Sequence, residues 1–200
     1  IIEELANRIK VPISIDTSKS LVAAAALSSG AAIVNDISAL RLDHHIADVV
    51  AEAGAGLVLM HSRGMADTLH GKPPVTDIMQ ELRQSLTDSI TLAERRGVKR
   101  KSIVIDPGIG FGKTQEQNLE LIARLNLVTE MFHEFPVLIG TSRKSFLGRI
   151  LDGAGTSERL HGTMASITVA VLRGADIVRV HDVKAARETA RVADELKRAS

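Results

Sequence analysis

Residues 102–114 read SIVIDPGIGFGKT, in which an apolar run ends at Asp106 and a glycine-dense loop follows. A short apolar run rich in Val and Ile is typical of a strand that is buried on both faces of a parallel sheet. Five further runs share this character and carry polar residues at their ends: 12–16 (PISID), 31–37 (AAIVNDI), 56–61 (GLVLMH), 136–142 (PVLIGTS) and 176–181 (DIVRVH). The sequence therefore predicts six buried strands.

Helical patterns separate these runs. The clearest has an apolar residue at every fourth position, and Gly97 follows it as a helix stop: Ile78, Leu82, Leu86 and Ile90. Shorter patterns lie at 23–27, 119–125, 164–173 and 184–198, and Asp182 is placed to cap the last of them. This alternation of strand and helix predicts parallel strands joined by right-handed crossovers.

Two α/β architectures fit such an alternation. A doubly wound sheet usually carries a glycine-rich phosphate turn after its first strand, and this chain has none there. Polar residues follow nearly every strand instead, which is where a (β/α)8 TIM barrel builds its active site. A full barrel needs about 250 residues, and the chain has 200. We therefore expect one domain over residues 1–200, an incomplete barrel with about six of eight strands, whose first two strands would precede Ile1.

Composition excludes several classes of function. The net charge is +1 and the aromatic residues are four Phe, which argues against a nucleic-acid partner. The absence of cysteine excludes disulfides and thiolate metal sites and fits a cytoplasmic enzyme. No apolar run reaches the roughly 18 residues that a membrane span needs. We expect small-molecule substrates, with no nucleic acid and no membrane.

The strand-end acids suggest a ring-binding site. An acid after a strand is as often a helix cap, so neither Asp16 nor Asp106 is decisive alone. A carboxylate can accept paired N–H bonds from a flat amino-heterocycle, much as it does from arginine. Asn35 adds a donor and an acceptor in one group. Together these three residues could bind the edge of an amino-oxo-pyrimidine ring.

The cations point to an anionic group. Arg179 lies inside an apolar run two residues before His181, so both side chains should lie on one face. Arginine rarely enters a core without a partner. With Lys144, at a predicted helix start that favours anions, these residues suit a phosphate-bearing ligand. A basic pair such as Arg143 and Lys144 is, however, more often part of a solvated surface.

Two other readings of the motifs are weaker. The segment GIGFGKT resembles a phosphate loop, but only three residues separate Gly108 from Gly112, and Pro107 stands where a glycine is required. His61 ends a strand, where a lone histidine is more often packed than catalytic. The histidines form no metal-binding spacing such as H-E-x-x-H, so no metal site is assigned within the chain.

The motifs together resemble dihydropteroate synthases. The similar segments are SIDTSK (14–19), IVNDIS (33–38), MHSRG (60–64), IDPGIGFGKT (105–114), GTSRKSFLG (140–148) and VRVHDV (178–183). The resemblance implies a TIM-barrel transferase of folate biosynthesis and sulfonamide target. It would join 6-hydroxymethyl-7,8-dihydropterin diphosphate to p-aminobenzoate, giving 7,8-dihydropteroate and diphosphate.

The resemblance also implies roles for individual residues. The pterin would be bound by six residues: Asp16, Asn35, Met60, Asp106, Gly140 and Lys144. Arg179 and His181 would hold the diphosphate and act with Lys144 in catalysis, and Phe111 and Ser145 would lie near p-aminobenzoate. The family also implies Mg2+ and a homodimer. The metal ligand is expected in the family's first loop, and that loop and the second strand's loop would precede Ile1.

Two alternatives stay open at this point. A related pterin-dependent methyltransferase barrel would use acids and Asn at strand ends in a similar way, but would not need SRKS and RVHDV to hold diphosphate. A barrel open at two sheet edges could also be a structural module, because unpaired edges invite association. We expect the 200 residues alone to be catalytically inactive and either poorly soluble or domain-swapped.

Overall fold

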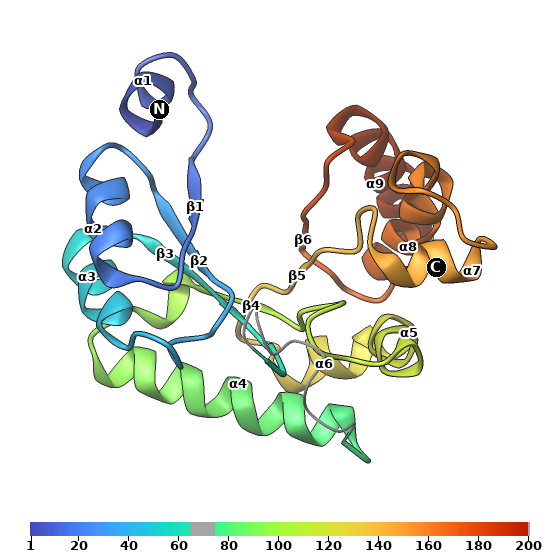
Figure 1. The fold of residues 1–200 in the computed structure, drawn as a ribbon, viewed down its shortest axis with the longest axis horizontal. Coiled ribbons are helices and arrows are strands. Elements are labelled where there is room, and N and C mark those ends of the chain that lie inside the picture. Colours follow the sequence, from blue (N-terminus) through green and yellow to red (C-terminus); the bar gives the residue numbers. More distant parts are fainter. Residues whose placement is uncertain (65–74, 200) are drawn as a thin grey trace. The chain divides into compact units, whose positions relative to one another are not determined.

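The computed structural model describes residues 1–64 and 75–199, and these form two compact units (Figure 1). The first unit comprises Ile1–Ser62 and Gln80–Asp106, and the second comprises Arg63–Met79 and Pro107–Ser200. Among the described residues, no helix has the length and apolar character needed to cross a membrane.

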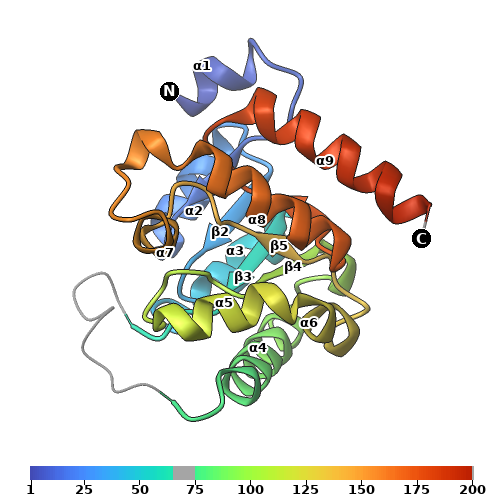
Figure 2. The same ribbon diagram turned by 90° about the vertical axis from the view of Figure 1, so that its right-hand side faces the viewer.

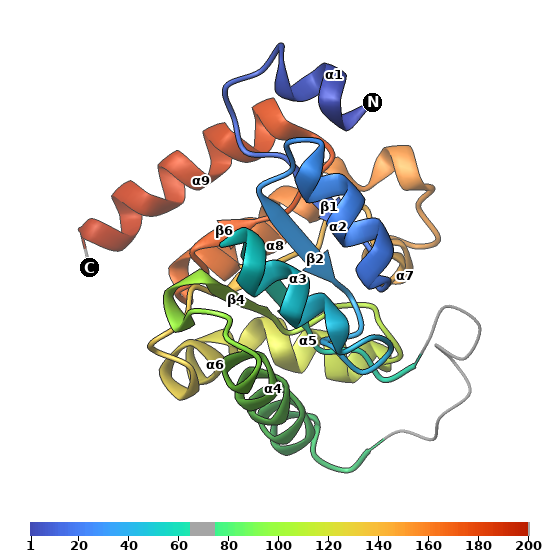
Figure 3. The same cartoon turned by 90° about the vertical axis from the view of Figure 1, so that its left-hand side faces the viewer.

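The first unit is built on a parallel sheet in the order β1-β2-β3-β4. Its strands are β1 (Ser14–Asp16), β2 (Ile33–Asp36), β3 (Gly56–Met60) and β4 (Ile103–Asp106). Its helices are α1 (Ile2–Ala6), α2 (Ser20–Ser28), α3 (His45–Ala53), α4 (Ile78–Arg95) and the short η1 (Arg100–Ser102). Helices α2, α3 and α4 cover one face of this sheet (Figures 1 and 3).

The core of the first unit follows from the apolar pattern. Leu57 and Leu59 of β3 and Ile105 of β4 are fully buried. Leu82 and Leu86 of α4 are also fully buried, as their four-residue spacing predicts. Helix α3 was not predicted, although three buried residues on its inner side have helical spacing: Ile46, Ala47 and Val50.

The second unit holds the remaining strands, β5 (Leu138–Ile139) and β6 (Ile177–Val178), which pair in parallel. Its helices are α5 (Gln115–Ala123), α6 (Leu125–Met131), α7 (Ser145–Ile150), η2 (Thr156–Glu158), α8 (Leu160–Leu172) and α9 (Val183–Arg198). Helices α8 and α9 pack together in both views (Figures 1 and 2). Their core contains Ile167 and Ala193, and Val178 and Val180 pack against it.

All six predicted strand runs contain a strand of the described structure, and every pairing is parallel. The α/β class is therefore confirmed. The run 136–142 is much longer than β5, which comprises two residues, and the run 176–181 likewise exceeds β6. In the second unit most of the predicted strand-end residues consequently lie in loops beyond the paired backbone.

Candidate functional site

In the first unit, the strand-end residues of the sheet lie on one face. Asp16 pairs with Asn35, Asn35 with Val58, and Met60 with Asp106 in the parallel register. Paired residues of neighbouring strands point to the same side, and side chains two residues apart in a strand do so as well. Asp16, Asn35, Met60 and Asp106 therefore share a face. The sequence predicts such a grouping for the three polar residues, Asp16, Asn35 and Asp106.

Asp16 and Asn35 contact each other directly. The Nδ2 group of Asn35 donates a hydrogen bond to Oδ1 of Asp16 over 2.7 Å. Asn35 is 3% exposed, whereas Asp16 is exposed. Among the described residues, Oδ1 of Asn35 has no hydrogen-bond partner. The pair thus presents a carboxylate together with a buried acceptor that no described protein group satisfies.

Asp106 and Met60 form the deeper part of this face. Asp106 is 2% exposed and Met60 is fully buried. The backbone N–H of His61 donates to the Asp106 carbonyl over 2.9 Å, which continues the pairing of β3 with β4 past Met60. The carboxylate of Asp106 is therefore carried on backbone that the sheet holds firmly.

Asp36 has a different role from its neighbour Asn35, because it points to the opposite face. Its carboxylate accepts from the N–H and hydroxyl of Ser38 and from the N–H of Leu40, at 2.8, 2.7 and 2.6 Å. Ala39 and Leu40 have φ values of 49° and 66°, a backbone region that costs energy for residues with a side chain. Burial raises the pKa of Asp36, while these hydrogen bonds act to lower it. We conclude that Asp36 stabilises the turn after β2.

In the glycine-dense loop of the second unit, every second residue from Gly108 to Gly112 has left-handed backbone. Gly108, Gly110 and Gly112 have φ values of 65°, 86° and 68°. The Asn118 side chain, which is 3% exposed, accepts from the Gly110 N–H at 2.6 Å and donates to the carbonyls of Lys113 and Thr114. Asn118 therefore fixes the path of the loop into α5.

Lys113 and Lys144 both donate to carbonyls of this loop. The buried Lys113 ammonium donates to the Gly108 carbonyl at 2.7 Å, unlike the lysine of a phosphate loop, which must reach a phosphate. Lys144 Nζ donates to the Ile109 carbonyl and lies 4.5 Å from the centroid of the Phe111 ring. Lys144 and Phe111, predicted from different motifs, are thus brought together within the second unit.

Arg179 lies beside Gly140, as β5–β6 register requires. The Arg179 N–H donates to the Ile139 carbonyl at 2.9 Å. A Cβ atom placed on Gly140 would lie 3.6 Å from Arg179 Nε, in ordinary van der Waals contact, so the two residues are close neighbours. Val178 and Val180 pack on α8 and α9, so Arg179 between them points to the other side.

Ser142 connects the ends of the two strands. Its hydroxyl lies 2.9 Å from Nδ1 of His181 and accepts from the His181 N–H at 3.2 Å. Both His181 and Ser145, which opens α7, are exposed. The structure therefore places Gly140, Arg179 and His181 on adjoining strand ends, and Ser142 is a partner that was not predicted.

The structure refines two expectations about charged residues. Arg143 is partly exposed, with 35% of its side chain accessible, and its guanidinium binds both oxygens of Asp182 at 3.0 and 2.5 Å. Asp182 stands at the N-cap position of α9, as predicted, but its side chain makes no cap bond, and its carboxylate binds Arg143 instead. This fork lowers the pKa of Asp182 and raises that of Arg143. A bidentate charged pair outweighs a single bond to a backbone N–H.

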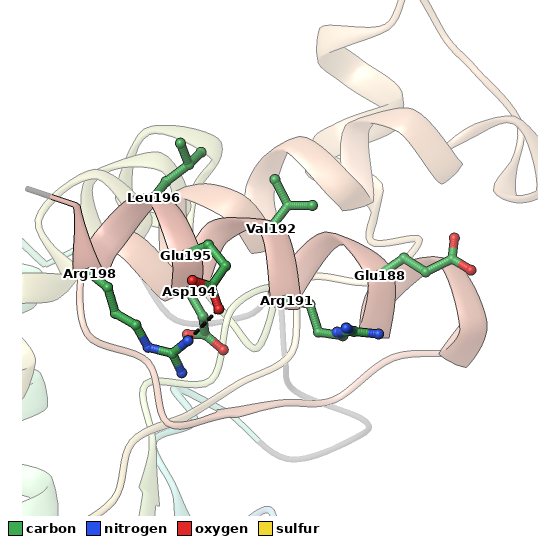
Figure 4. Close-up of a pocket in the computed structure, with 7 residues that line it drawn as sticks. All are labelled: Glu188, Arg191, Val192, Asp194, Glu195, Leu196 and Arg198. Carbon is green, nitrogen blue, oxygen red and sulfur yellow. Dashed lines mark hydrogen bonds and ion pairs between the residues drawn. The ribbon is translucent and has the colours of Figure 1, made fainter.

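A hollow on the surface of the second unit is not the site. It is lined entirely by residues of α9, including Val192, Leu196 and the ion-paired Glu195 and Arg198 (Figure 4). Residues along a single helix cannot enclose a small molecule. None of the predicted site residues belongs to this hollow.

Comparison with known proteins identifies the family. Residues 1–181 match the family described as pterin binding enzymes. The dihydropteroate synthase of Synechocystis is 44% identical over 99% of this chain, and that of Bacillus subtilis is 39% identical over 97%. The chain belongs to the dihydropteroate synthase family. It spans about two thirds of these relatives, 68% of the first and 65% of the second.

Dihydropteroate synthase structures also share the fold. The Clostridium difficile enzyme, solved in the presence of pteroic acid, aligns with a TM-score of 0.90 and 40% identity over 98% of this chain and 71% of that one. The fold is accordingly that of a (β/α)8 barrel, with six strands in the described residues. The strand-end positions described above are therefore those at which such a barrel places its active site.

Metal-binding groups are absent from the described part of the chain. Residues 1–64 and 75–199 contain no group of three or more His, Cys, Asp or Glu side chains that could hold a metal ion. The described side chains therefore form no dedicated cage for a metal, whereas magnesium is usually held by one or two carboxylates together with waters and substrate phosphates. No step below is therefore assigned to a metal.

Proposed function

We propose that the full-length protein condenses 6-hydroxymethyl-7,8-dihydropterin diphosphate with p-aminobenzoate, giving 7,8-dihydropteroate and diphosphate. The observation that carries this proposal is the chemistry of the strand ends in a dihydropteroate synthase chain. The first unit offers carboxylates and an amide on one sheet face, and the second offers cations on adjoining strand ends. Acceptors suit a ring rich in N–H groups, and cations suit a diphosphate.

Asp16, Asn35, Met60 and Asp106 would bind the pterin ring. Support comes from Asn35, whose buried Oδ1 has no hydrogen-bond partner among the described residues. An unsatisfied buried acceptor costs about 1–3 kcal/mol, which a ligand N–H would recover. The Asp106 carboxylate, 2% exposed, would accept further N–H groups at the ring edge.

Gly140 and Lys144 would adjoin the ring, and Arg179 and His181 would hold the diphosphate. Lys144, Arg179 and His181 would then act in catalysis. The reaction breaks the bond between the pterin methylene carbon and the diphosphate oxygen, and forms a bond from that carbon to the amine nitrogen, which loses a proton. Cations beside the departing oxygens would stabilise the negative charge that develops there.

Phe111 and Ser145 would lie near p-aminobenzoate. Phe111 presents an aromatic ring next to Lys144, and Ser145 opens α7 with an exposed side chain. A flat benzoate ring suits contact with another aromatic ring. The family resemblance further suggests a Mg2+ requirement, a homodimer and a cytoplasmic location, and we include all three in the proposal.

The proposal is tested with Asp106→Asn in the full-length protein. Titration calorimetry with a pterin should show about 100-fold weaker binding, because the amide loses charge and one acceptor. Asp88→Asn, on the exposed surface of α4, is the matched control and should bind like the wild type. Equal pterin affinity for wild type and Asp106→Asn would refute the assignment.

A diphosphate-release assay separates the alternatives. With both substrates present, the wild-type protein should release diphosphate. A pterin-dependent methyltransferase would bind the pterin without releasing diphosphate. A structural module would do neither.

A further inference from the structure

The loops after β5 and β6 keep the register of the strands beyond the last paired backbone residues. Leu138 pairs with Ile177, and Ile139 with Val178, so partners differ by 39 positions. Ser142 and His181 differ by 39, as do Arg143 and Asp182, and both pairs are joined by side-chain bonds. The ladder thus continues as two side-chain pairs where the sheet has ended.

The last of these pairs is held in a demanding conformation. Arg143 has a φ of 58°, which is unfavourable for a residue with a side chain. Its N–H donates to the hydroxyl of Thr163 at 3.1 Å, and its carbonyl accepts from the guanidinium of Arg159 at 2.9 Å. Three contacts, including the fork on Asp182, therefore fix the residue directly before Lys144.

Asp182 is equally well placed to fix the position of the residue before it, His181. It directly follows His181 and precedes α9, yet its carboxylate makes no cap bond to that helix. Its partner atoms, Nε and Nη2 of Arg143, form a planar fork that sets both distance and orientation. The two loops are thereby fixed next to each other at the positions that carry Lys144 and His181.

We propose that Arg143 and Asp182 are a positioning pair that holds the loops of Lys144 and His181 at the separation that a diphosphate group requires. This inference rests on the proposed function, because the diphosphate is its ligand. The pair has no net charge, so it orders the loops without neutralising the cations around it. Neither side chain needs to touch the substrate.

The pair is distinct from a direct ligand contact. An arginine binds phosphate oxygens through a two-N–H edge of its guanidinium, and the Nε/Nη2 edge of Arg143 is occupied by Asp182. Because the role is geometric, an ion pair of reversed polarity should perform it as well. Aspartate tolerates left-handed backbone better than most residues, so Arg143→Asp adds little strain.

The test uses Asp182→Asn and the double variant Arg143→Asp/Asp182→Arg in the full-length protein. Asp182→Asn should lower kcat/KM for the pterin diphosphate roughly 10- to 100-fold, as small misplacements of catalytic groups do. Its affinity for a pterin that lacks the diphosphate should fall much less, because the ring-binding acceptors of the first unit, Asp16, Asn35 and Asp106, do not depend on this pair. The double variant should recover most of the lost kcat/KM.

Glu120→Gln removes an ion pair with Arg124 on the exposed side of α5 and serves as the matched control. Wild-type affinity of Asp182→Asn for both ligands would overturn the inference. The inference would also be overturned if Asp182→Asn lost affinity for both ligands equally and melted at a lower temperature, because that result indicates a purely structural pair. A folded double variant without recovery would also overturn it. Failure of the wild type to release diphosphate would instead refute the proposed function.

Discussion

In the first unit, backbone register alone brings Asp16 beside Asn35 and Met60 beside Asp106, whereas in the second unit β5 and β6 pair over only two residues each. The second unit continues the alignment with side chains, through Ser142 and Arg143. Sheet backbone is held by many hydrogen bonds, and a loop is held by the few side chains that bind it. The two units therefore differ in what a single substitution can disturb.

The two units also differ in the chemistry that they present. The first unit places acceptors on a buried face, and Asn35 and Asp106 are almost inaccessible to solvent. The second presents the basic residues Lys144 and Arg179, which are half-buried, and His181, which is exposed. Ring recognition by hydrogen bonds depends on exact geometry, which a sheet supplies, whereas a diphosphate is attracted to positive charge over longer distances.

The largest predicted effect separates the two units by ligand. Arg179→Ala should weaken binding of the pterin diphosphate about 100-fold, because a cation beside the anion is lost. Binding of a pterin without the diphosphate should change by less than about twofold. Asp106→Asn, by contrast, should weaken binding of both ligands by a similar factor. Calorimetric titration of the two ligands against the two variants measures all four values.

Raising the salt concentration provides a further check. Higher salt should weaken binding of the pterin diphosphate more than binding of the uncharged pterin, because ions screen exposed charges. If Arg179→Ala weakened binding of both ligands equally, Arg179 would not be a specific contact of the diphosphate.

The contrast between the units explains what the sequence could predict. All six strands were predicted, because a short apolar run has few alternatives in a parallel α/β fold. Asp16, Asn35 and Asp106 were predicted as a group since they end such runs. Within the first unit, strand position and proposed function coincide, so a local pattern is sufficient to find the polar groups.

In the second unit the local pattern was not sufficient. Asp182 precedes a helix and therefore suggested a cap, and Arg143 beside Lys144 suggested a solvated surface. Which residue meets Arg143 depends on the register of β5 and β6, and register is set by packing against other elements rather than by nearby sequence. The constant separation of 39 positions becomes visible only once the pairing is known.

Helix α3 and the turn after β2 show the same limit on a smaller scale. Helix α3 is short, and it follows a turn in which Ala39 and Leu40 adopt left-handed backbone. Such a conformation is not expected for these residue types, because glycine is the usual choice. It is stabilised by Asp36, a residue for which the sequence pattern predicts no separate role.

An intermediate effect is predicted for two glycines that differ in surroundings. Gly110 in the second unit and Gly54 in the first have φ values of 86° and 64°. Alanine at either position should lower the free energy of unfolding by about 1–2 kcal/mol, because both must keep left-handed backbone. A Cβ at Gly110 would also lie 3.1 Å from Cδ of Lys144, whereas nothing lies within 4 Å at Gly54.

Ligand binding should therefore distinguish the two variants, although urea denaturation gives them similar losses. Gly110→Ala should weaken the pterin diphosphate several-fold by displacing Lys144, about 1 kcal/mol, and Gly54→Ala should bind like the wild type. If Gly54→Ala weakened binding as much, backbone strain in general would account for the loss, and Lys144 would not.

The smallest predicted effect is a pH dependence of opposite sign in the two units. Asp36 and Asp182 share an ordinary pKa of 3.8. Burial raises the pKa of Asp36, so folding favours its protonated form, and its contribution to stability is lost as pH rises through the raised value. The hydrogen-bonded Arg143 lowers the pKa of Asp182, so its contribution is present above 3.8 and lost as pH falls through the lowered value.

Carboxyl carbon chemical shifts measured by NMR during a pH titration should show Asp182 titrating below 3.8 and Asp36 above it. Unfolding experiments between about pH 3 and pH 7 provide the thermodynamic counterpart. The stability difference between wild type and Asp182→Asn should shrink on acidification, because the wild-type carboxylate becomes protonated and releases Arg143. The difference for Asp36→Asn should instead shrink as pH rises, since the buried wild-type carboxyl must then ionise. Parallel trends in the two variants would mean that burial and ion pairing do not separate the two units as their structures indicate.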